Sequence, residues 1–419
     1  MPAAGLSRAE ARGKPVTVAD RRNLPVSNAI PATFPGGLPP AGPAGKDIAG
    51  SRGRPKSGTP VARQSPSRSR ARGAFLAAPV LAAFSMPFGA DAPRADEPLR
   101  FDSCADLSLY LESREPHDRV RLAPETYECS EPLNPAVDGL HIDFGGTLLR
   151  VADNVLRPAI VLGNLHTPPE RRHTAITVLN LRVDGNRANQ EFECWGGPCD
   201  PAVNDDPFWQ QRLNGVTVNG CDDCALINVA VSGARSGGVV VVHSRRLLVD
   251  GLEAERSYFD GLAGYTTYDS VFRNVRVRHN DYSGFSFDLD FSGNRIEGFE
   301  SSDNSGHGLF IRYAADNVFA HGSFSRNGQD GVYFDRAHPD RTQTCAEGTR
   351  LEGVGISGNG RYGAWLDFEC ASNEFASSVF ADNRHGDFGG RRTDLIGWSD
   401  GLAHTGAEPE ETTDSGAGI

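Results

Sequence analysis

The fold is decided by a short phrase that returns along the chain: SGFSF at Ser283–Phe287, HGLFI at His307–Ile311 and DGVYF at Asp330–Phe334. In each phrase a polar residue and a glycine precede alternating apolar residues. The phrase occurs eight times between Asn214 and Asp387, and its glycines are spaced by 23, 23, 23, 24, 23, 32 and 23 residues. A near-constant period of this length, with short strands in each repeat, is typical of a solenoid whose coils stack on one another.

Asparagines recur at a fixed place in this period, four residues before the glycine: Asn280, Asn304, Asn327 and Asn359. Stacked coils bring equivalent residues about 4.8 Å apart. We therefore expect these side chains to form a hydrogen-bonded ladder, with each asparagine in the left-handed conformation that this residue tolerates. The glycine is expected at a sharp corner without room for a Cβ atom.

These features resemble the right-handed parallel β-helix proteins of the pectate-lyase-like superfamily, from about Phe101 to Gly390. Three further phrases strengthen the resemblance: LAPETY at Leu122–Tyr127, IDFGG at Ile142–Gly146 and VDGNR at Val183–Arg187. It implies an all-β right-handed parallel β-helix with a short N-terminal capping helix. A leucine-rich repeat has a similar period, but it needs leucines at fixed spacing and a helical arc, which this sequence lacks.

The composition changes sharply near residue 95. Residues 1–94 contain 14 basic and 4 acidic residues, whereas residues 95–419 contain 28 arginines, no lysine and 50 acidic residues, a net charge of −22. Nucleic acid is not an expected partner of so acidic a body, because phosphates need a basic face. The sequence contains no run of about 18 apolar residues, so no membrane-spanning helix is predicted. The charge also disfavours a polyanionic glycan unless calcium bridges, and a neutral or mixed glycan is at least as well suited.

Four segments are predicted from these patterns. Residues 1–67 are expected to be disordered, since they lack apolar periodicity. Residues 68–92 resemble a secretory signal peptide, with a basic start, an apolar centre and an Ala-x-Ala end. This position far inside the chain would be explained by a start codon placed too far upstream; the alternative is a chance apolar patch. Residues 95–390 form the β-helix, and residues 391–419 are expected to be a disordered tail.

All eight cysteines follow residue 95. An even number in an exported protein predicts disulfides, which indicates a secreted or periplasmic location. The Cys221–Cys224 pair has an alternative as half of a zinc site or a redox motif, although no second C-x-x-C exists. Spacing suggests the pairs Cys104 with Cys129, Cys194 with Cys199, Cys221 with Cys224, and Cys345 with Cys370.

Alternation within each phrase predicts which side chains point outward. Positions one and three after the glycine should face the core, and positions two and four should face outward. Position four then carries Asp288, Arg312 and Asp335 on three successive coils, which we predict as catalytic residues. Aromatic side chains stack on sugar rings, and the predicted substrate-binding residues are Tyr265, Phe310, Tyr333 and Trp365.

The two predicted catalytic aspartates are compatible with more than one reaction. Asp288 and Asp335 lie two coils apart, roughly 9.6 Å between backbones, near the upper separation of an inverting glycosidase pair, about 6.5–9.5 Å. In a lyase or C5-epimerase, Arg312 would instead neutralise a uronate carboxylate. Lyases that use a lysine base cannot be matched, because this region has no lysine. The structural alternative is a salt-bridge ladder in which Arg312 only neutralises its neighbours.

A second candidate column is the residue before each glycine. The stretch Gly306–Leu309 resembles the G-H-G-L stretch of polygalacturonases, and Asp260 stands where that family has its first catalytic aspartate. The middle coil departs from the family, because Tyr282 and Ser283 replace two adjacent aspartates. Only His307 and Asp260 are therefore carried over as catalytic candidates. The structural alternative for His307 is a corner residue that bonds to a neighbouring coil.

Two functions follow from these patterns. The first is an exported carbohydrate-active enzyme acting on a polysaccharide, as a lyase, C5-epimerase or inverting hydrolase. The alternative is a non-catalytic β-helix that binds glycans or supports the cell envelope. No cofactor is predicted; calcium alone is considered, through Asp288, Asp290 or Asp205–Asp206. Long interruptions at Glu191–Arg212 and near His338–Glu347 are expected to shape a cleft, and the oligomeric state is not predicted.

Overall fold

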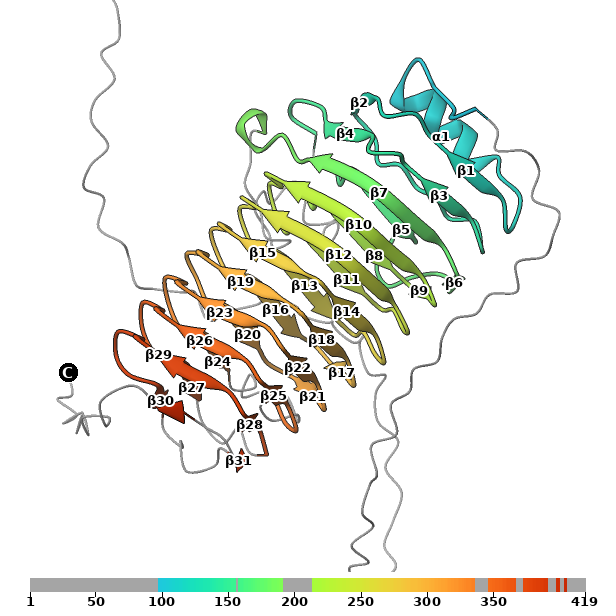
Figure 1. The fold of residues 1–419 in the computed structure, drawn as a ribbon. Helices are drawn as coiled ribbons and strands as arrows, with labels where there is room; N and C mark the ends of the chain where they lie inside the picture. Colours follow the sequence, from blue (N-terminus) through green and yellow to red (C-terminus); the bar gives the residue numbers. More distant parts are fainter. Residues whose placement is uncertain are drawn as a thin grey trace, which may run out of the picture. The chain divides into compact units, whose positions relative to one another are not determined.

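The computed structural model describes residues 97–155, 157–190, 213–335, 346–366, 372–390, 397–399 and 403–404. All of them belong to the second of the two units into which the chain divides, residues 70–419. The predicted disordered segment 1–67 and the signal-like segment 68–92 lie outside the described residues. The described chain winds into stacked coils, each of which contributes strands to two main walls (Figure 1).

A short helix, α1 (Cys104–Glu112), lies at the N-terminal end of the coils (Figure 1). Its N-cap is Ser103, whose hydroxyl oxygen accepts a hydrogen bond from the backbone N–H of Asp106 at 3.1 Å. Leu107 and Leu111 are buried against the first coils. The predicted capping helix is therefore confirmed.

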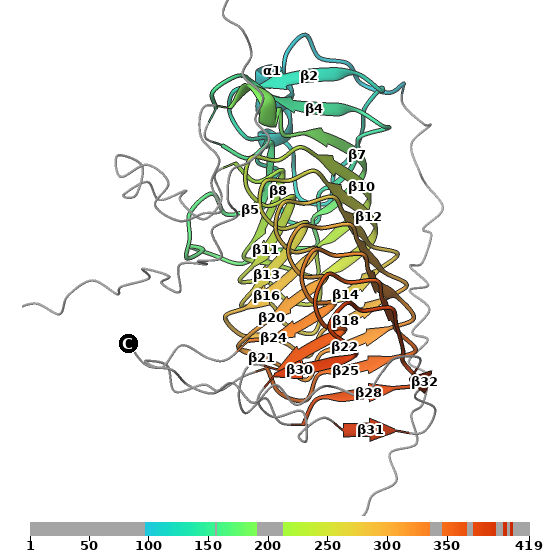
Figure 2. The same ribbon diagram turned by 90° about the vertical axis from the view of Figure 1, so that its left-hand side faces the viewer.

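One wall is a nine-stranded parallel sheet. Its strands, in order along the stack, are β5 (Ile160–Gly163), β8 (Val216–Asn219), β11 (Val239–Val242), β13 (Leu262–Tyr265), β16 (Phe285–Asp288), β20 (Leu309–Ile311), β24 (Val332–Phe334), β27 (Ala364–Leu366) and β30 (Phe388–Gly390). Figure 2 shows most of them side by side in this order.

The other wall is a nineteen-stranded sheet in which all described pairings are parallel. Its strands are β1 (Arg119–Arg121), β2 (Thr126–Cys129), β3 (His141–Asp143), β4 (Leu148–Val151), β7 (Thr177–Asp184), β10 (Ala225–Ser232), β12 (Leu248–Glu255), β14 (Val271–Arg273), β15 (Arg276–Arg278), β18 (Arg295–Glu297), β19 (Glu300–Ser302), β22 (Val318–Ala320), β23 (Ser323–Ser325), β25 (Arg350–Glu352), β26 (Gly355–Ser357), β28 (Glu374–Ala376), β29 (Val379–Ala381), β31 (Gly397–Ser399) and β32 (Ala403–His404). Short pairs complete the coils: β6 (His173–Thr174) with β9 (Cys221–Asp222), and β17 (Phe291–Ser292) with β21 (Ala314–Ala315). A single 3-10 turn, η1 (Arg187–Asn189), follows β7.

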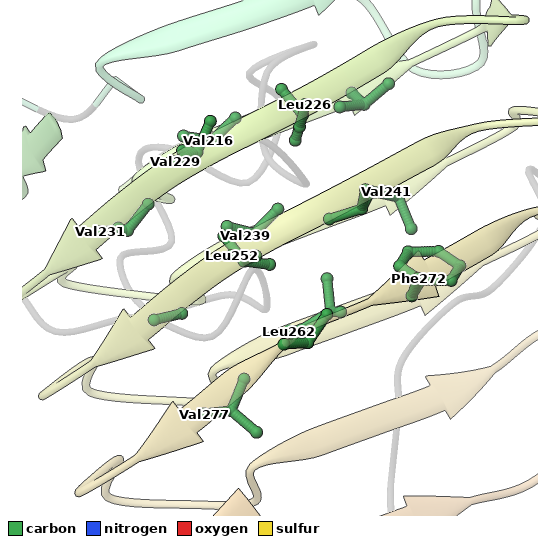
Figure 3. Packing of buried hydrophobic residues seen from close by; sticks show 14 of the residues in the cluster. Val216, Leu226, Val229, Val231, Val239, Val241, Leu252, Leu262, Phe272 and Val277 are labelled. Atoms are coloured by element: carbon green, nitrogen blue, oxygen red, sulfur yellow. The ribbon is translucent and has the colours of Figure 1, made fainter. Parts of the chain in front are cut away.

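The register of the nine-stranded sheet follows the repeat. Phe285 lies opposite Leu309, and Leu309 lies opposite Val332, so residues one period apart are neighbours. The predicted inward positions fill the space between the walls, and Figure 3 shows valines and leucines of both walls in contact there. Further along the stack phenylalanines dominate, and the rings of Phe287 and Phe291 stack with centroids 4.0 Å apart. The predicted core is confirmed.

The predicted asparagine ladder is also confirmed. Asn304 accepts hydrogen bonds from the backbone N–H and the side-chain amide of Asn280, at 3.0 and 2.9 Å, and the same pattern continues through Asn327 and Asn359 to Asn383. The predicted left-handed conformation was assigned to the wrong residue. The residue before each asparagine adopts it, for example Asp303 with φ 57°. This bend aims the following asparagine inward, where its amide completes the turn.

A second ladder was not predicted from the sequence. Asn294 donates its backbone N–H and its side-chain amide to Asn317, at 3.0 and 3.2 Å, and accepts the N–H of Ser270. Its asparagines are 23 residues apart, so the signal was present in the sequence. Buried asparagine amides therefore connect successive coils both before and after the strands of the nine-stranded sheet.

Two of the four predicted disulfides lie within the described residues, and both are confirmed: Cys104–Cys129 and Cys221–Cys224. The second leaves no thiol at Cys221 or Cys224 to bind zinc in this state, whereas a redox role for the pair, which a disulfide also fits, stays untested. The predicted pairs Cys194–Cys199 and Cys345–Cys370 lie outside the described residues. Within the described part of the chain, no helix combines the length and apolar character needed to cross a membrane.

The C-terminal boundary of the β-helix differs from the prediction. β31 pairs with β28 and β32 pairs with β29, so the coils continue past residue 390 into the segment predicted to be a disordered tail. The polar, glycine-rich composition of this segment obscured its strands. Main-chain pairing with the preceding coil supplies their register, which local composition does not reveal.

Candidate functional site

The predicted site residues lie on the outer side of the nine-stranded sheet and at the corner before it. Register places Tyr265 of β13 opposite Asp288 of β16. It also places Phe310, Tyr333 and Trp365 in one row across β20, β24 and β27. We call this surface the candidate face, defined by Asp260, Tyr265, Ser286, Asp288, His307, Phe310, Arg312, Tyr333, Asp335 and Trp365.

Arg312 joins the two predicted catalytic aspartates. Its Nε lies 3.1 Å and its Nη2 2.5 Å from Asp288 Oδ2, while its Nη1 lies 3.0 Å from Asp335 Oδ2. Asp288 is only 2% exposed, and its other oxygen accepts the N–H of Leu289. Burial lowers the pKa of Arg312, but the hydrogen bonds and charges of both aspartates outweigh it and raise this pKa overall. The contacts are those of the salt-bridge ladder that was considered as the structural alternative to a catalytic role for these three residues.

Replacing Arg312 with alanine is expected to lower the free energy of unfolding by about 3 kcal/mol, because Asp288 would stay buried without its counter-charge. The matched control is Arg326→Ala. Arg326 makes the same kind of pair with Asp303 one coil earlier, but its side chain is 60% exposed, so we expect less than about 1 kcal/mol. Urea unfolding at pH 7 measures both changes. Equal effects of the two substitutions would contradict this account.

The aromatic row is packed differently from a simple sugar-binding strip. The ring of Tyr333 stacks on His307 with centroids 4.5 Å apart and on Phe310 at 5.8 Å. Trp365 packs against Tyr362, and the guanidinium of Arg361 lies over its ring at 5.0 Å. Part of each ring is therefore packed within the protein, and these half-buried side chains leave only a part of their surface for a ligand.

Asp260 occupies the corner before β13. It is 2% exposed, and its Oδ1 accepts the backbone N–H of Ser283 from the next coil at 2.9 Å. In the described structure its Oδ2 is buried without a hydrogen-bond partner. Burial raises the pKa of this carboxyl to about 7, although the Ser283 N–H and the nearby Ser286 hydroxyl oppose the rise. Asp260 therefore exchanges a proton near neutral pH.

Tyr265 lies next to this carboxyl. Burial and the negative charges of Asp260 and Asp288 raise the pKa of its phenol, and the charge of Arg312 and the Ser286 hydroxyl only partly oppose them. The phenol thus stays protonated. It can donate a hydrogen bond, but it cannot act as a base at neutral pH.

His307 lies two coils from Asp260 in the same corner column. Its Nδ1 is 3.2 Å from Asp330 Oδ2 and 3.3 Å from the backbone N of Asp330. Burial lowers the pKa of His307, the Asp330 carboxylate raises it, and Arg361 lowers it, with a net decrease. The imidazole is therefore neutral at pH 7. The corner contact to the next coil that was considered as the structural alternative is present.

Other outward positions are covered, against the expectation of an open face. Asn219 and Thr217 on β8 are fully buried. The amide of Asn219 donates to the carbonyl oxygens of Asn164 and His166, so the loop after β5 lies over this end of the sheet. Alternation alone could not reveal this loop contact. Glu191–Arg212 and most of the interruption near His338–Glu347, which were expected to shape a cleft, lie outside the described residues.

Metal ligands are not gathered on the described coils. No group of three or more His, Cys, Asp or Glu side chains there is arranged to hold a metal ion. Of the residues considered for calcium, Asp288 is bound to Arg312, and Asp290 accepts hydrogen bonds from the hydroxyls of Tyr268 and Ser292. The Asp205–Asp206 pair lies outside the described residues. The described geometry therefore offers no support for calcium.

Comparison with known proteins extends the fold assignment. A family model described as a right handed beta helix region matches residues 214–345. Curated protein sequences gave no match. Among solved structures, ORF18 of Geobacillus virus E2 superposes with a TM-score of 0.54 at 10% identity, covering 70% of this chain and 57% of that one.

Two enzymes are also among the similar structures. The A-module of the Azotobacter vinelandii mannuronan C-5 epimerase AlgE6 has a TM-score of 0.44 at 12% identity, covering 70% of this chain and 91% of the module. Pectate lyase Pel9A has a TM-score of 0.38 at 14% identity, covering 69% and 72%. Likenesses at such identity concern the fold alone. The parallel coils, the asparagine ladder and the matched family model establish that the protein folds as a right-handed parallel β-helix.

Proposed function

We propose that this protein acts on a polysaccharide, with Asp260 and His307 as its proton-transferring pair and with hydrolysis as its reaction. The observation that carries the proposal is that two residues of one corner column, Asp260 and His307, have pKa values shifted in opposite directions. Burial holds Asp260 protonated up to about pH 7 and holds His307 neutral. Groups whose environments assign them opposite proton roles are what acid–base catalysis requires.

The spacing of this pair suits an inverting hydrolase. Asp260 and His307 are separated by two coils, roughly 9.6 Å between backbones, so their side chains must turn toward each other to reach a separation of about 6.5–9.5 Å, like that between the two carboxyl groups of an inverting enzyme. Nδ1 of His307 accepts the backbone N–H of Asp330 at 3.3 Å in this structure and lies 3.2 Å from Asp330 Oδ2. For His307 to act as the base through Nε2, its proton must move to Nδ1 and be held by Asp330 Oδ2 in place of the contact with that N–H. Nε2 would then keep the lone pair that activates water. Asp288, Arg312 and Asp335 would position this surface rather than transfer protons.

The charges on the candidate face favour a neutral glycan over a polyuronate. A lyase or epimerase must neutralise the uronate carboxylate, yet Arg312 is already bound by two aspartates. The ion-paired trio carries a net charge of −1, and the body around it is acidic. Like charges would repel a polyanion here.

A polysaccharide panel tests the reaction. Neutral glycans (mixed-linkage β-glucan, galactomannan and xylan) and polygalacturonate are incubated with the protein at pH 6. We expect new reducing ends from at least one neutral glycan, with inverted anomeric configuration by NMR. Absorbance near 235 nm would report eliminative cleavage, and epimerisation would appear in the NMR spectrum of the polymer; either result would replace hydrolysis by that reaction.

One observation favours a non-catalytic glycan-binding or envelope β-helix as the second candidate. Residues before the glycines bond to the next coil in several places: Asn214 accepts the N–H of Gly237, Asp260 that of Ser283, and Asp330 that of Tyr362. A purely structural column would look the same in this respect. Binding without any product in the panel would select this candidate.

Export is part of the proposal. Two disulfides in the described residues suit an oxidising compartment. We therefore propose a secreted or periplasmic location, which matches a substrate found outside the cytosol.

A further inference from the structure

An exposed aromatic side chain stands beside the Asp260–His307 column. Tyr282 is 42% exposed, and it is the one aromatic residue among the large apolar side chains that the described structure leaves exposed. It lies directly before Ser283, the residue between Asp260 and His307 in the corner column. Neither the core nor the ladders use its outer surface.

The coils on either side of Tyr282 determine which part of its ring is open. Backbone hydrogen bonds align Phe259, Tyr282 and Gly306 on successive coils, since Tyr282 N–H donates to Phe259 and Gly306 N–H donates to Tyr282. The Phe259 ring packs against Tyr282 with centroids 4.5 Å apart. The next coil has glycine at this place, and a Cβ there would lie 2.8 Å from the Tyr282 carbonyl carbon. Gly306, the residue aligned with Tyr282 on the next coil, therefore places no side chain against the ring.

The ring is held in place rather than free to swing. Tyr258 packs against it edge-on at 6.0 Å, and the Arg187 guanidinium lies over Tyr258 at 5.3 Å while it pairs with Asp281. A preorganised aromatic surface loses little conformational entropy when a ligand stacks on it.

We propose that the Tyr282 ring, on its side over Gly306, is a stacking platform for one neutral pyranose ring of the polysaccharide. A sugar seated there would lie beside His307, the residue that follows Gly306, and beside Asp260 on the other side of Ser283. The platform would thus place the ring next to both proton-transferring groups. This inference rests on the proposed function for the identity of its ligand.

The chemistry around the platform selects a neutral sugar. Burial, and then Tyr258, Asp260 and Asp281, raise the pKa of the Tyr282 phenol, so it stays a hydrogen-bond donor for a sugar hydroxyl. Arg187, whose guanidinium lies over the neighbouring Tyr258 ring, is paired with Asp281. A uronate would find Arg187 already paired with Asp281, whereas the apolar face of a neutral pyranose can stack and its hydroxyls can bond.

Affinity electrophoresis in gels containing mixed-linkage β-glucan, galactomannan, xylan or polygalacturonate tests the platform. We expect at least one neutral glycan to retard the wild-type protein, Tyr282→Ala to weaken that binding about tenfold, and Tyr282→Trp to keep it. Leu109→Ala is the control, because Leu109 is also exposed but lies on α1. The melting temperatures of all variants are compared, and Tyr282→Trp separates a folding defect from lost stacking.

Several outcomes would overturn the platform: retardation only by polygalacturonate, retardation by no glycan, or wild-type affinity in Tyr282→Ala. Self-association lost in Tyr282→Ala during sedimentation would also overturn it, since the surface would then serve a second copy of the chain. The experiments can reject the stacking platform and the proposed hydrolysis independently of each other. Weakened binding by Tyr282→Ala without any hydrolysis supports the platform and rejects the reaction, whereas hydrolysis with unchanged binding does the reverse.

Discussion

Replacing Asn304 with alanine is expected to lower the free energy of unfolding by about 5 kcal/mol. Asn304 is buried in the middle of the ladder and accepts two hydrogen bonds from Asn280. Its amide donates to the Val277 carbonyl and to Asn327. Alanine would remove these four hydrogen bonds in a place that water does not reach. The Asn280 amide would keep its bond to the Ala254 carbonyl, and Asn327 Oδ1 would keep the Asn304 backbone N–H. Each buried polar group left unpaired costs about 1–3 kcal/mol.

Urea unfolding followed by circular dichroism measures this loss. Asn274→Gly is the control, because Asn274 is exposed on a neighbouring turn with φ 54° and glycine keeps that left-handed conformation. We expect the control to change stability by less than about 1 kcal/mol. A loss below about 1 kcal/mol for Asn304→Ala would mean that the ladder follows from coil stacking and does not stabilise it.

Replacing Asp260 with asparagine is expected to reduce hydrolysis by about 10²–10⁴-fold while the fold survives, because an amide cannot donate the catalytic proton. The chain itself shows that asparagine is accepted at this corner. Asn214 occupies the equivalent place, where its oxygen accepts the Gly237 N–H at 3.2 Å and its amide donates to Thr217 at 3.2 Å. Wild-type activity is expected to fall as pH rises through about 7, where the acid loses its proton.

The same carboxyl gives a stability signature that needs no substrate. Its pKa is raised from 3.8 to about 7 in the folded state, so the folded state holds this proton more tightly than the unfolded chain. The contribution is complete below pH 3.8 and is lost as pH rises through about 7, by up to about 4 kcal/mol. Asp260→Asn should therefore gain stability relative to wild type between pH 4 and pH 8. An unchanged difference across this range, or full activity in the variant, would remove Asp260 from the acid role.

The repeat period in the sequence predicts which residues of successive coils lie next to each other, and therefore most of the fold. Glycine spacing alone placed Phe310 beside Tyr333, and Asp288 and Asp335 on either side of Arg312, because side-chain alternation and coil stacking follow directly from it. It could not show that one guanidinium binds both aspartates closely enough to occupy them. That outcome depends on side-chain rotamers and burial, which a repeat period does not encode.

Other features were present in the sequence but needed the structure to be recognised. Asn294 and Asn317 have the ladder's spacing, yet the equivalent position on the preceding coil is Ser270, so the asparagines do not recur long enough to mark a ladder. Tyr282 was noted only as a departure from the polygalacturonase pattern. Its exposure follows from Gly306 on the next coil, a relation between residues 24 positions apart that becomes visible only when coils are aligned.

The uniform contact between coils has an evolutionary consequence. Since each turn of the stack offers the next the same asparagine, the same glycine corner and the same strand register, duplication or loss of one whole turn would leave complementary surfaces on both sides. The number of turns can therefore change during evolution while each turn still packs against its neighbours. Under the proposed mechanism that freedom ends between Asp260 and His307, because one turn inserted or removed there would change the distance between the two groups proposed to act on a single bond.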